Sequence, residues 1–260
     1  MSVPETKSSE ITEKINLLSR QDVVTPFEVK SLQRQIDLLK QKRAGESYML
    51  TGMLSSILGE YPRSKEFHEK SLKISSSLVE IVNYAVSMKR LGHSTESLTL
   101  YLRAADMDPA NPVYVECALQ LMAFTGDFER YEALVSRFHR ANPEFNISEI
   151  DFVSTINSIR HHLEVVGVPE HEFKIAGALV EQAMSEFGYN AKHMFEQLSN
   201  FDSVAHIYVE LAVEAKCASD LVKVNNRVVE LIIDCDALTC WDKLVYNIVS
   251  FHSSAAEDAA

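Results

Sequence analysis

The chain has 260 residues, 46% apolar and 24% charged, a composition that can fill a hydrophobic core and excludes a wholly disordered chain. Its 37 acidic residues outnumber 25 basic ones, and the net charge of −12 disfavours non-specific binding of nucleic acid. With only eight glycines and seven prolines, long helices are favoured over an all-β fold. The negative charge arises in residues 144–260, which hold 19 acidic and 7 basic residues.

Two amphipathic helices are expected in an N-terminal segment, residues 1–44. The first, over residues 9–20, has three aliphatic residues at helical spacing. These are Ile11, Ile15 and Leu18. The second begins after Thr25, because a capping box with Glu28 and a proline between them mark a helix N-terminus. Its polar face is basic, and it fits either a nucleic-acid patch or, more simply, a solvated face. That face holds Lys30, Arg34, Lys40, Lys42 and Arg43.

Residues 45–145 contain a repeat of 33 or 34 residues. Glycines and prolines recur at this interval. They are Gly59, Gly92 and Gly126, with Pro109 and Pro143. Aligned on these marks, the three repeats span residues 45–77, 78–111 and 112–145. Each repeat is expected to form two helices, joined at the glycine and ended by the proline in the second and third repeats.

The second repeat carries a family resemblance. Its second half, residues 90–111, reads RLGHSTESLTLYLRAADMDPAN, which resembles the tetratricopeptide (TPR) repeat. The resemblance implies a stack of three helical hairpins that binds a peptide or helix of another protein on the concave surface of its first helices. The architecture is also loosely similar to that of the cytoplasmic chaperones of bacterial type III secretion translocators.

The alignment predicts which side chains the first helices present to a partner. They are Glu46, Met49, Met53, Val79, Val82, Val86, Lys89, Val113, Glu116 and Gln120. A core between helices would use the same apolar residue types, so Met53, Val82 and Val86 fit both a groove and a core. Some TPR domains hold a C-terminal carboxylate with Lys and Asn, but the matching positions here are apolar. A role in binding chaperone tails is therefore not expected.

An acidic C-terminal domain, residues 146–260, is expected to follow. Helical patterns cover residues 150–163 and 169–187, and a further helix is predicted over residues 219–232. The stretches 204–213 and 243–251 are rich in β-branched residues and fit either strands or buried helices. We favour helix narrowly, with a strand–helix–strand unit as the alternative. The fold class is thus mainly α.

Chemistry-bearing residues form no strong motif. His161, His162 and His171 flank a helix connection and are the only candidates for a metal site, although adjacent histidines point to different helix faces. Cys235, Cys240, Asp242 and His252 form a nominal Cys–His set for catalysis. No phosphate loop, nucleophile elbow or zinc-protease motif is present. We therefore expect no enzyme activity, no cofactor and no metal.

These observations favour a cytoplasmic, non-enzymatic scaffold, adaptor or chaperone. No apolar run approaches the roughly 20 residues of a membrane span, and residues 1–14 lack the apolar region of a signal peptide. The cysteines, Cys117, Cys217, Cys235 and Cys240, show no paired spacing and are expected to be reduced thiols. The alternative is an antidote that neutralises a basic toxin through its acidic C-terminal half.

Overall fold

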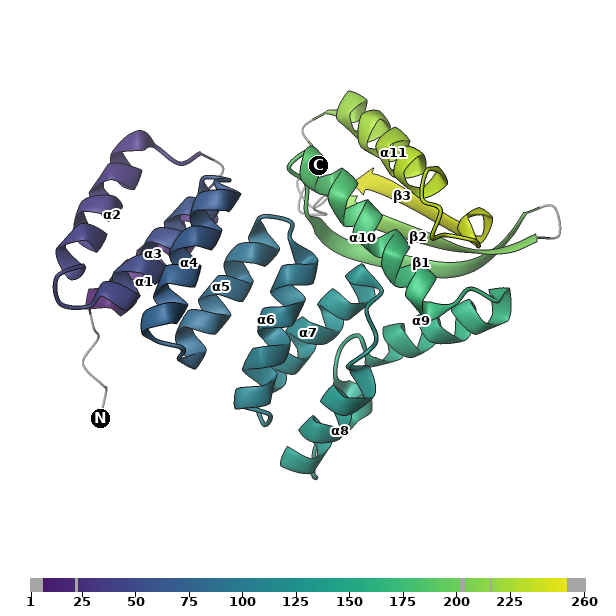
Figure 1. Ribbon diagram of the computed structural model, residues 1–260, viewed down its shortest axis with the longest axis horizontal. Helices are drawn as coiled ribbons and strands as arrows, with labels where there is room; N and C mark the ends of the chain where they lie inside the picture. Colours follow the sequence, from purple (N-terminus) through teal and green to yellow (C-terminus); the bar gives the residue numbers. More distant parts are fainter. Residues whose placement is uncertain (1–6, 22, 202–203, 216, 252–260) are drawn as a thin grey trace, which may run out of the picture.

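The computed structural model describes residues 7–21, 23–201, 204–215 and 217–251. The chain is mainly helical, as expected, and carries a small sheet near its C-terminus (Figure 1). The helices are α1 (Lys7–Leu18), α2 (Pro26–Leu39), α3 (Ala44–Ile57), α4 (Tyr61–Ile74), α5 (Leu78–Arg90), α6 (Ser94–Met107), α7 (Pro112–Thr125), α8 (Tyr131–Ala141), α9 (Val153–Val166), α10 (Glu170–Glu186) and α11 (Ala218–Ile233). The strands are β1 (Ala191–Phe201), β2 (Val204–Val213) and β3 (Leu244–Ser250).

Three consecutive helical hairpins, α3–α4, α5–α6 and α7–α8, stack side by side (Figure 1). Each of the first two hairpins contains the same serine-to-carbonyl hydrogen bond, and the two bonds lie 33 residues apart in the sequence. Ser64 Oγ donates to the Gly52 carbonyl at 2.9 Å, and Ser97 Oγ donates to the Ala85 carbonyl at 2.8 Å. Small residues at these positions let the paired helices approach closely. The third hairpin lacks this bond, since Tyr131 replaces the serine.

The N-terminal helices α1 and α2 pack against α3 and enclose a separate, smaller core. The predicted capping box is present, with the Glu28 amide donating to Thr25 Oγ1 and the Thr25 amide donating to Glu28 Oε2. Ser47 Oγ on α3 donates to the Ile36 carbonyl of α2 at 3.2 Å. The smaller core consists of Ile11, Ile15, Leu18, Leu32, Ile36, Leu39, Met49, Leu50, Met53 and Leu54.

The C-terminal region folds as helices α9–α11 around a sheet of order β1-β2-β3. Strands β1 and β2 are antiparallel, whereas β2 and β3 are parallel and joined through α11. The strand–helix–strand unit is thus present, and the narrow preference for helix over residues 204–213 and 243–251 was wrong. Asn225 of α11 covers the outer edge of β3, where its side chain both donates to and accepts from the Ile248 backbone at 2.8 Å. Such capping blocks strand pairing at that edge.

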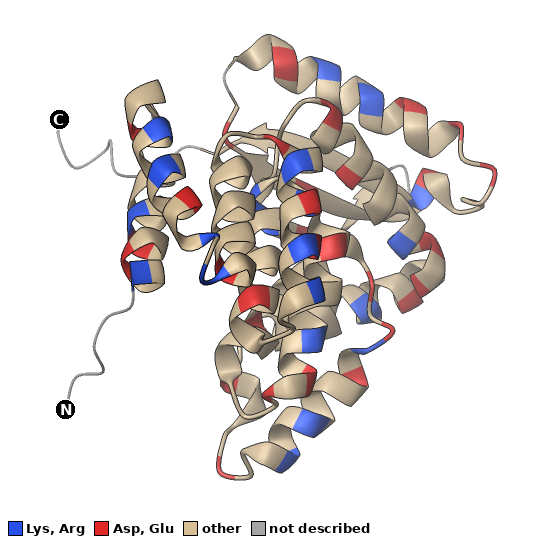
Figure 2. Ribbon diagram, turned by 60° about the vertical axis from the view of Figure 1, so that its left-hand side comes forward, with Lys and Arg blue, Asp and Glu red and all other residues tan. Residues whose placement is uncertain are grey.

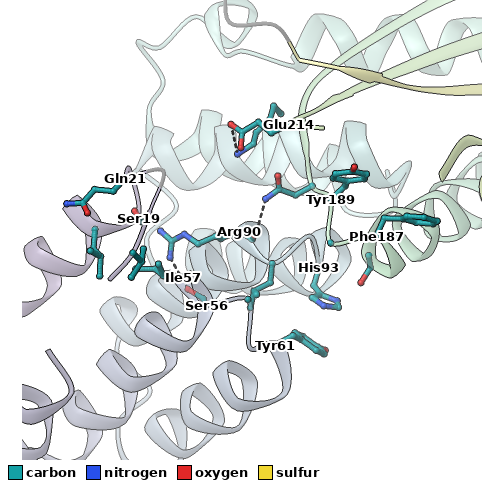
Figure 3. Close-up of a pocket in the computed structure, with 18 of the residues that line it drawn as sticks. Ser19, Gln21, Ser56, Ile57, Tyr61, Arg90, His93, Phe187, Tyr189 and Glu214 are labelled. Atoms are coloured by element: carbon teal, nitrogen blue, oxygen red, sulfur yellow. Dashed lines mark hydrogen bonds and ion pairs between the residues drawn. The ribbon is translucent and has the colours of Figure 1, made fainter. Parts of the chain in front are cut away.

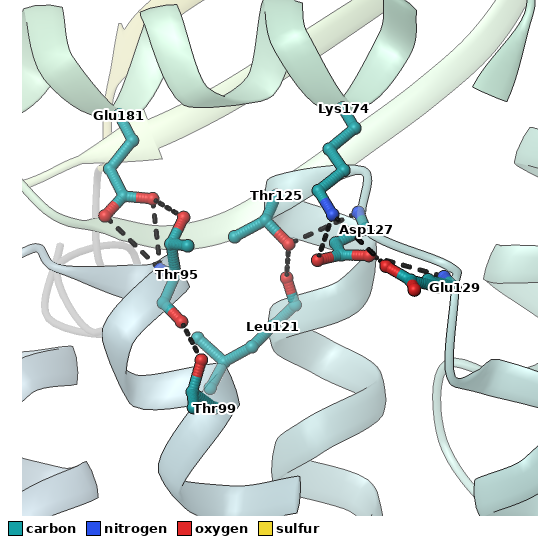
Figure 4. Close-up of polar contacts among 8 residues, drawn as sticks. All are labelled: Thr95, Thr99, Leu121, Thr125, Asp127, Glu129, Lys174 and Glu181. Atoms are coloured by element: carbon teal, nitrogen blue, oxygen red, sulfur yellow. Dashed lines mark hydrogen bonds and ion pairs between the residues drawn. The ribbon is translucent and has the colours of Figure 1, made fainter. Parts of the chain in front are cut away.

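Helix α10 joins this region to the stack by crossing the turns of the second and third hairpins. Figure 4 shows the polar contacts: Glu181 accepts from the Thr95 hydroxyl at 2.6 Å, and Lys174 pairs with Asp127 at 2.8 Å. A larger core runs without a break from Ile81 on α5 to β3. It therefore crosses the predicted domain boundary at residue 145.

Candidate protein-binding groove and adjoining cleft

Helices α5 and α7 are the first helices of neighbouring hairpins, and we call the side chains that they leave at least partly accessible on one side the groove face. It consists of Val79, Val82, Asn83 and Val86 of α5 with Val113, Glu116, Cys117 and Gln120 of α7. Val79 is 60% exposed and Val113 55% exposed, although both are aliphatic. Val82 and Val86 are partly buried against the larger core. A hydrogen bond from Lys89 to the Gln120 side chain joins the two helices.

The alignment treated the three repeats alike, but in the structure two of the predicted groove residues of the first repeat are buried. Met49 and Met53 are only 3% and 1% exposed, so they lie in the core instead of on the predicted open groove. They share the smaller core with apolar residues of α1, which packs against α3. Glu46 remains accessible and pairs with Arg43 at 3.2 Å. The groove face is accordingly confined to α5 and α7.

A cleft of about 850 Å³ adjoins the C-terminal end of α5. We call it the junction cleft, because its walls come from the α1–α2 connection on one side and the α10–β1 connection on the other (Figure 3). The turns α3–α4 and α5–α6 form its floor. Its lining includes Leu18, Gln21, Tyr61, Arg90, Tyr189 and Glu214. No sequence pattern predicted this cleft, since five separate chain segments meet there.

Arg90 lies at the centre of the junction cleft (Figure 3). Its Nη1 donates to Ser56 Oγ at 2.9 Å, and its carbonyl accepts from Asn190 at 2.7 Å. Among the described residues it has no carboxylate partner within 4.0 Å. Burial lowers the pKa of Arg90, which nevertheless stays cationic at neutral pH. The cleft therefore contains a positive charge that is hydrogen-bonded only to neutral groups.

Two further cations lie near Arg90. Burial lowers the pKa of Lys89, whose ammonium group donates a hydrogen bond to the neutral side-chain amide of Gln120. Lys192, at the start of β1, pairs loosely with the exposed Glu214 at 3.5 Å. On the cleft floor, the Tyr61 and His93 rings stack at 3.6 Å, and burial lowers the pKa of His93. Glu214 and Asp220 also line the cleft, so its walls carry both basic and acidic side chains.

The candidate metal and catalytic residues do not converge. His162 Nδ1 lies 2.6 Å from a carboxylate oxygen of Glu196 on β1, while His161 and His171 are exposed. Within the described part of the chain, no three His, Cys, Asp or Glu residues are arranged to hold a metal ion. Cys240 Sγ contacts the Gly167 carbonyl at 3.8 Å. His252 of the nominal Cys–His set lies outside the described residues.

The basic face of α2 is open to solvent. Lys30, Arg34, Lys40, Lys42 and Arg43 are all exposed. Lys40 lies 5.8 Å from the Tyr48 ring centroid, and Arg43 already pairs with Glu46.

No family model, no curated protein and no solved structure matches the chain. Across the residues that the structure describes, none of the helices has both the length and the apolar character needed to cross a bilayer.

Proposed function

We propose that this chain is a non-enzymatic, cytoplasmic TPR-like scaffold, adaptor or chaperone that holds a peptide or helix of another protein on its groove face. The repeated serine-to-carbonyl bond of the first two hairpins and the glycine turns support the TPR-like interpretation. Residues from the first helices of two neighbouring hairpins then form one continuous binding surface.

The exposed valines carry the proposal. Val79 and Val113 occupy equivalent positions, 34 residues apart, and both leave most of an aliphatic side chain in water. Exposed aliphatic side chains that lie together and are bordered by polar groups typify protein-binding surfaces. Lys89, Glu116 and Gln120 provide hydrogen-bonding groups beside them, and such groups fix the register of a bound segment.

Site-specific photo-crosslinking tests this assignment. A benzophenone amino acid placed at residue 79 or 113 should crosslink one and the same protein in native cells. The matched controls are residues 99 on α6 and 222 on α11, which are exposed but lie off the groove face. In addition, Val79→Asp with Val113→Asp should weaken binding of that protein at least tenfold without lowering the melting temperature. Equal crosslinking from the control positions would contradict the groove assignment.

The antidote remains a second candidate, because residues 144–260 hold 19 acidic and only 7 basic residues. Their described basic residues are already engaged: Arg160, Lys174, Lys192, Lys223 and Arg227 contact carboxylates, and Lys243 donates to a carbonyl. Figure 2 shows Lys and Arg in blue and Asp and Glu in red along the ribbon. A basic toxin held this way should dissociate in high salt, whereas an apolar segment on the groove face should not.

A further inference from the structure

Helix α1 shows how one face of the stack accepts a helix. Its residues Ile11, Ile15 and Leu18, at positions i, i+4 and i+7, are buried in the same core as Met49 and Met53 of α3. Met49 and Met53 occupy the positions in the first repeat that the alignment equates with Val82 and Val86 in the second. An amphipathic helix therefore already lies over the α3 counterpart of the groove face.

The groove face offers similar chemistry without such a cover. Val82 and Val86 replace the two methionines, and the neighbouring Val79 is largely exposed. The corresponding α7 positions, Glu116 and Gln120, are polar, so one side of the surface is aliphatic and the other hydrogen-bonding. This division fits one amphipathic helix better than an apolar strand.

The charges at one end of this surface add a second requirement. Lys89 and Arg90 occupy the last turn of α5, and their side chains donate hydrogen bonds to a neutral amide and a neutral hydroxyl, respectively. In a chain with an excess of twelve negative charges, carboxylate partners are plentiful, yet these two cations have none among the described residues. The junction cleft leaves room beside Arg90 for an incoming group.

We infer that the partner segment is an amphipathic helix with aliphatic residues at i, i+4 and i+7 and a carboxylate at the end that meets Lys89 and Arg90. The aliphatic residues pack on Val79, Val82 and Val86. The carboxylate accepts charge-assisted hydrogen bonds, which are shorter and stronger than those between neutral groups. This inference rests on the proposed function and specifies the partner's chemistry.

A displayed peptide library tests it. The library consists of 16-residue helical peptides with aliphatic residues fixed at i, i+4 and i+7 and with Glu, Gln or Lys varied at the other positions. It is selected against the full chain. We expect enriched peptides to carry Glu near one end and to lose about tenfold in affinity on Arg90→Gln. Lys30→Gln, which removes an exposed cation on α2, should leave affinity unchanged.

Charge reversal makes the test specific. Arg90→Glu should invert the preference for Glu. A selected peptide in which Lys replaces the terminal Glu should then bind the variant more tightly than the Glu-containing peptide does. Unchanged melting temperatures confirm that the variants fold. Peptides with no preference for Glu, an absence of enriched peptides, or an unaltered preference in the Arg90→Glu variant would overturn the inference. If residues 79 and 113 still crosslink a partner in that case, the proposed function stands. Only the inference that the partner is an amphipathic helix with a terminal carboxylate is then rejected.

Discussion

Replacing Gly177 by leucine should destabilise the folded chain by roughly 3 kcal/mol or more, because a side chain there overlaps the backbone of α7. A Cβ at this position would lie 2.4 Å from the Thr125 carbonyl oxygen and 2.8 Å from its carbon. Backbone atoms cannot rotate aside as a side chain can, so α10 must shift. Since α10 contributes to the larger core, the loss should appear in urea unfolding followed by far-UV circular dichroism.

Ala178→Leu is the matched control for this substitution. Ala178 is the next residue of the same helix and is exposed, so leucine there should change the free energy of unfolding by less than about 0.5 kcal/mol. The comparison is conservative, because leucine favours a helix over glycine by up to about 1 kcal/mol and this gain opposes the predicted loss. Similar unfolding midpoints for the two variants would show that α10 does not pack closely on α7.

Acid should destabilise the protein strongly through His68. The ring is 0% exposed, stacks on Tyr84 at 4.8 Å, and has one hydrogen-bond partner, Ser87 Oγ at 2.9 Å. Nδ1 lacks a partner in the described structure, and burial lowers the pKa of His68 to about 3. In the unfolded chain this pKa is about 6.5, so between these values the unfolded state binds the extra proton.

Because the unfolded state binds this proton and the native state does not, the free energy of unfolding should fall as the pH falls. Below pH 6.5 each further pH unit should remove about 1.4 kcal/mol of stability, until the native ring protonates near pH 3. His68→Gln should flatten the slope of unfolding free energy between pH 4 and 6, whatever its effect at neutral pH. His139→Gln, at an exposed position on α8, should keep the wild-type slope. A slope in His68→Gln as steep as in the wild type would assign the acid sensitivity elsewhere.

The helical part of the fold could be predicted because its signals are local. Each glycine turn and each capping residue acts within a few positions of its own helix, so residues 45–145 gave three hairpins. The sheet was harder to predict. Strand β1 mixes polar and apolar residues, as in AKHMFEQLSNF, and one face of the sheet is left partly to solvent. Buried β-branched runs such as β2 fit a strand or a helix until their neighbours are known.

The candidate site depended on long-range packing, which one sequence does not reveal. Met53 and Val86 have equivalent positions in the repeat, but Met53 is buried in the core that α1 and α3 share, whereas Val86 is only partly buried. Nothing in the sequence around Arg90 indicated a binding site. An arginine at the end of a helix is ordinary, since the helix dipole favours it there, and only the three-dimensional structure shows that none of the described carboxylates pairs with it.

The junction cleft lies between two separate hydrophobic cores, so a molecule bound there would affect how cooperatively the chain unfolds. Leu18 on one wall belongs to the smaller core, whereas Tyr189 on the opposite wall belongs to the larger one. A molecule seated in the cleft contacts groups supported by both. Because binding to the native state alone raises its stability, occupancy would make the two cores open together and turn two partly independent units into one cooperative unit.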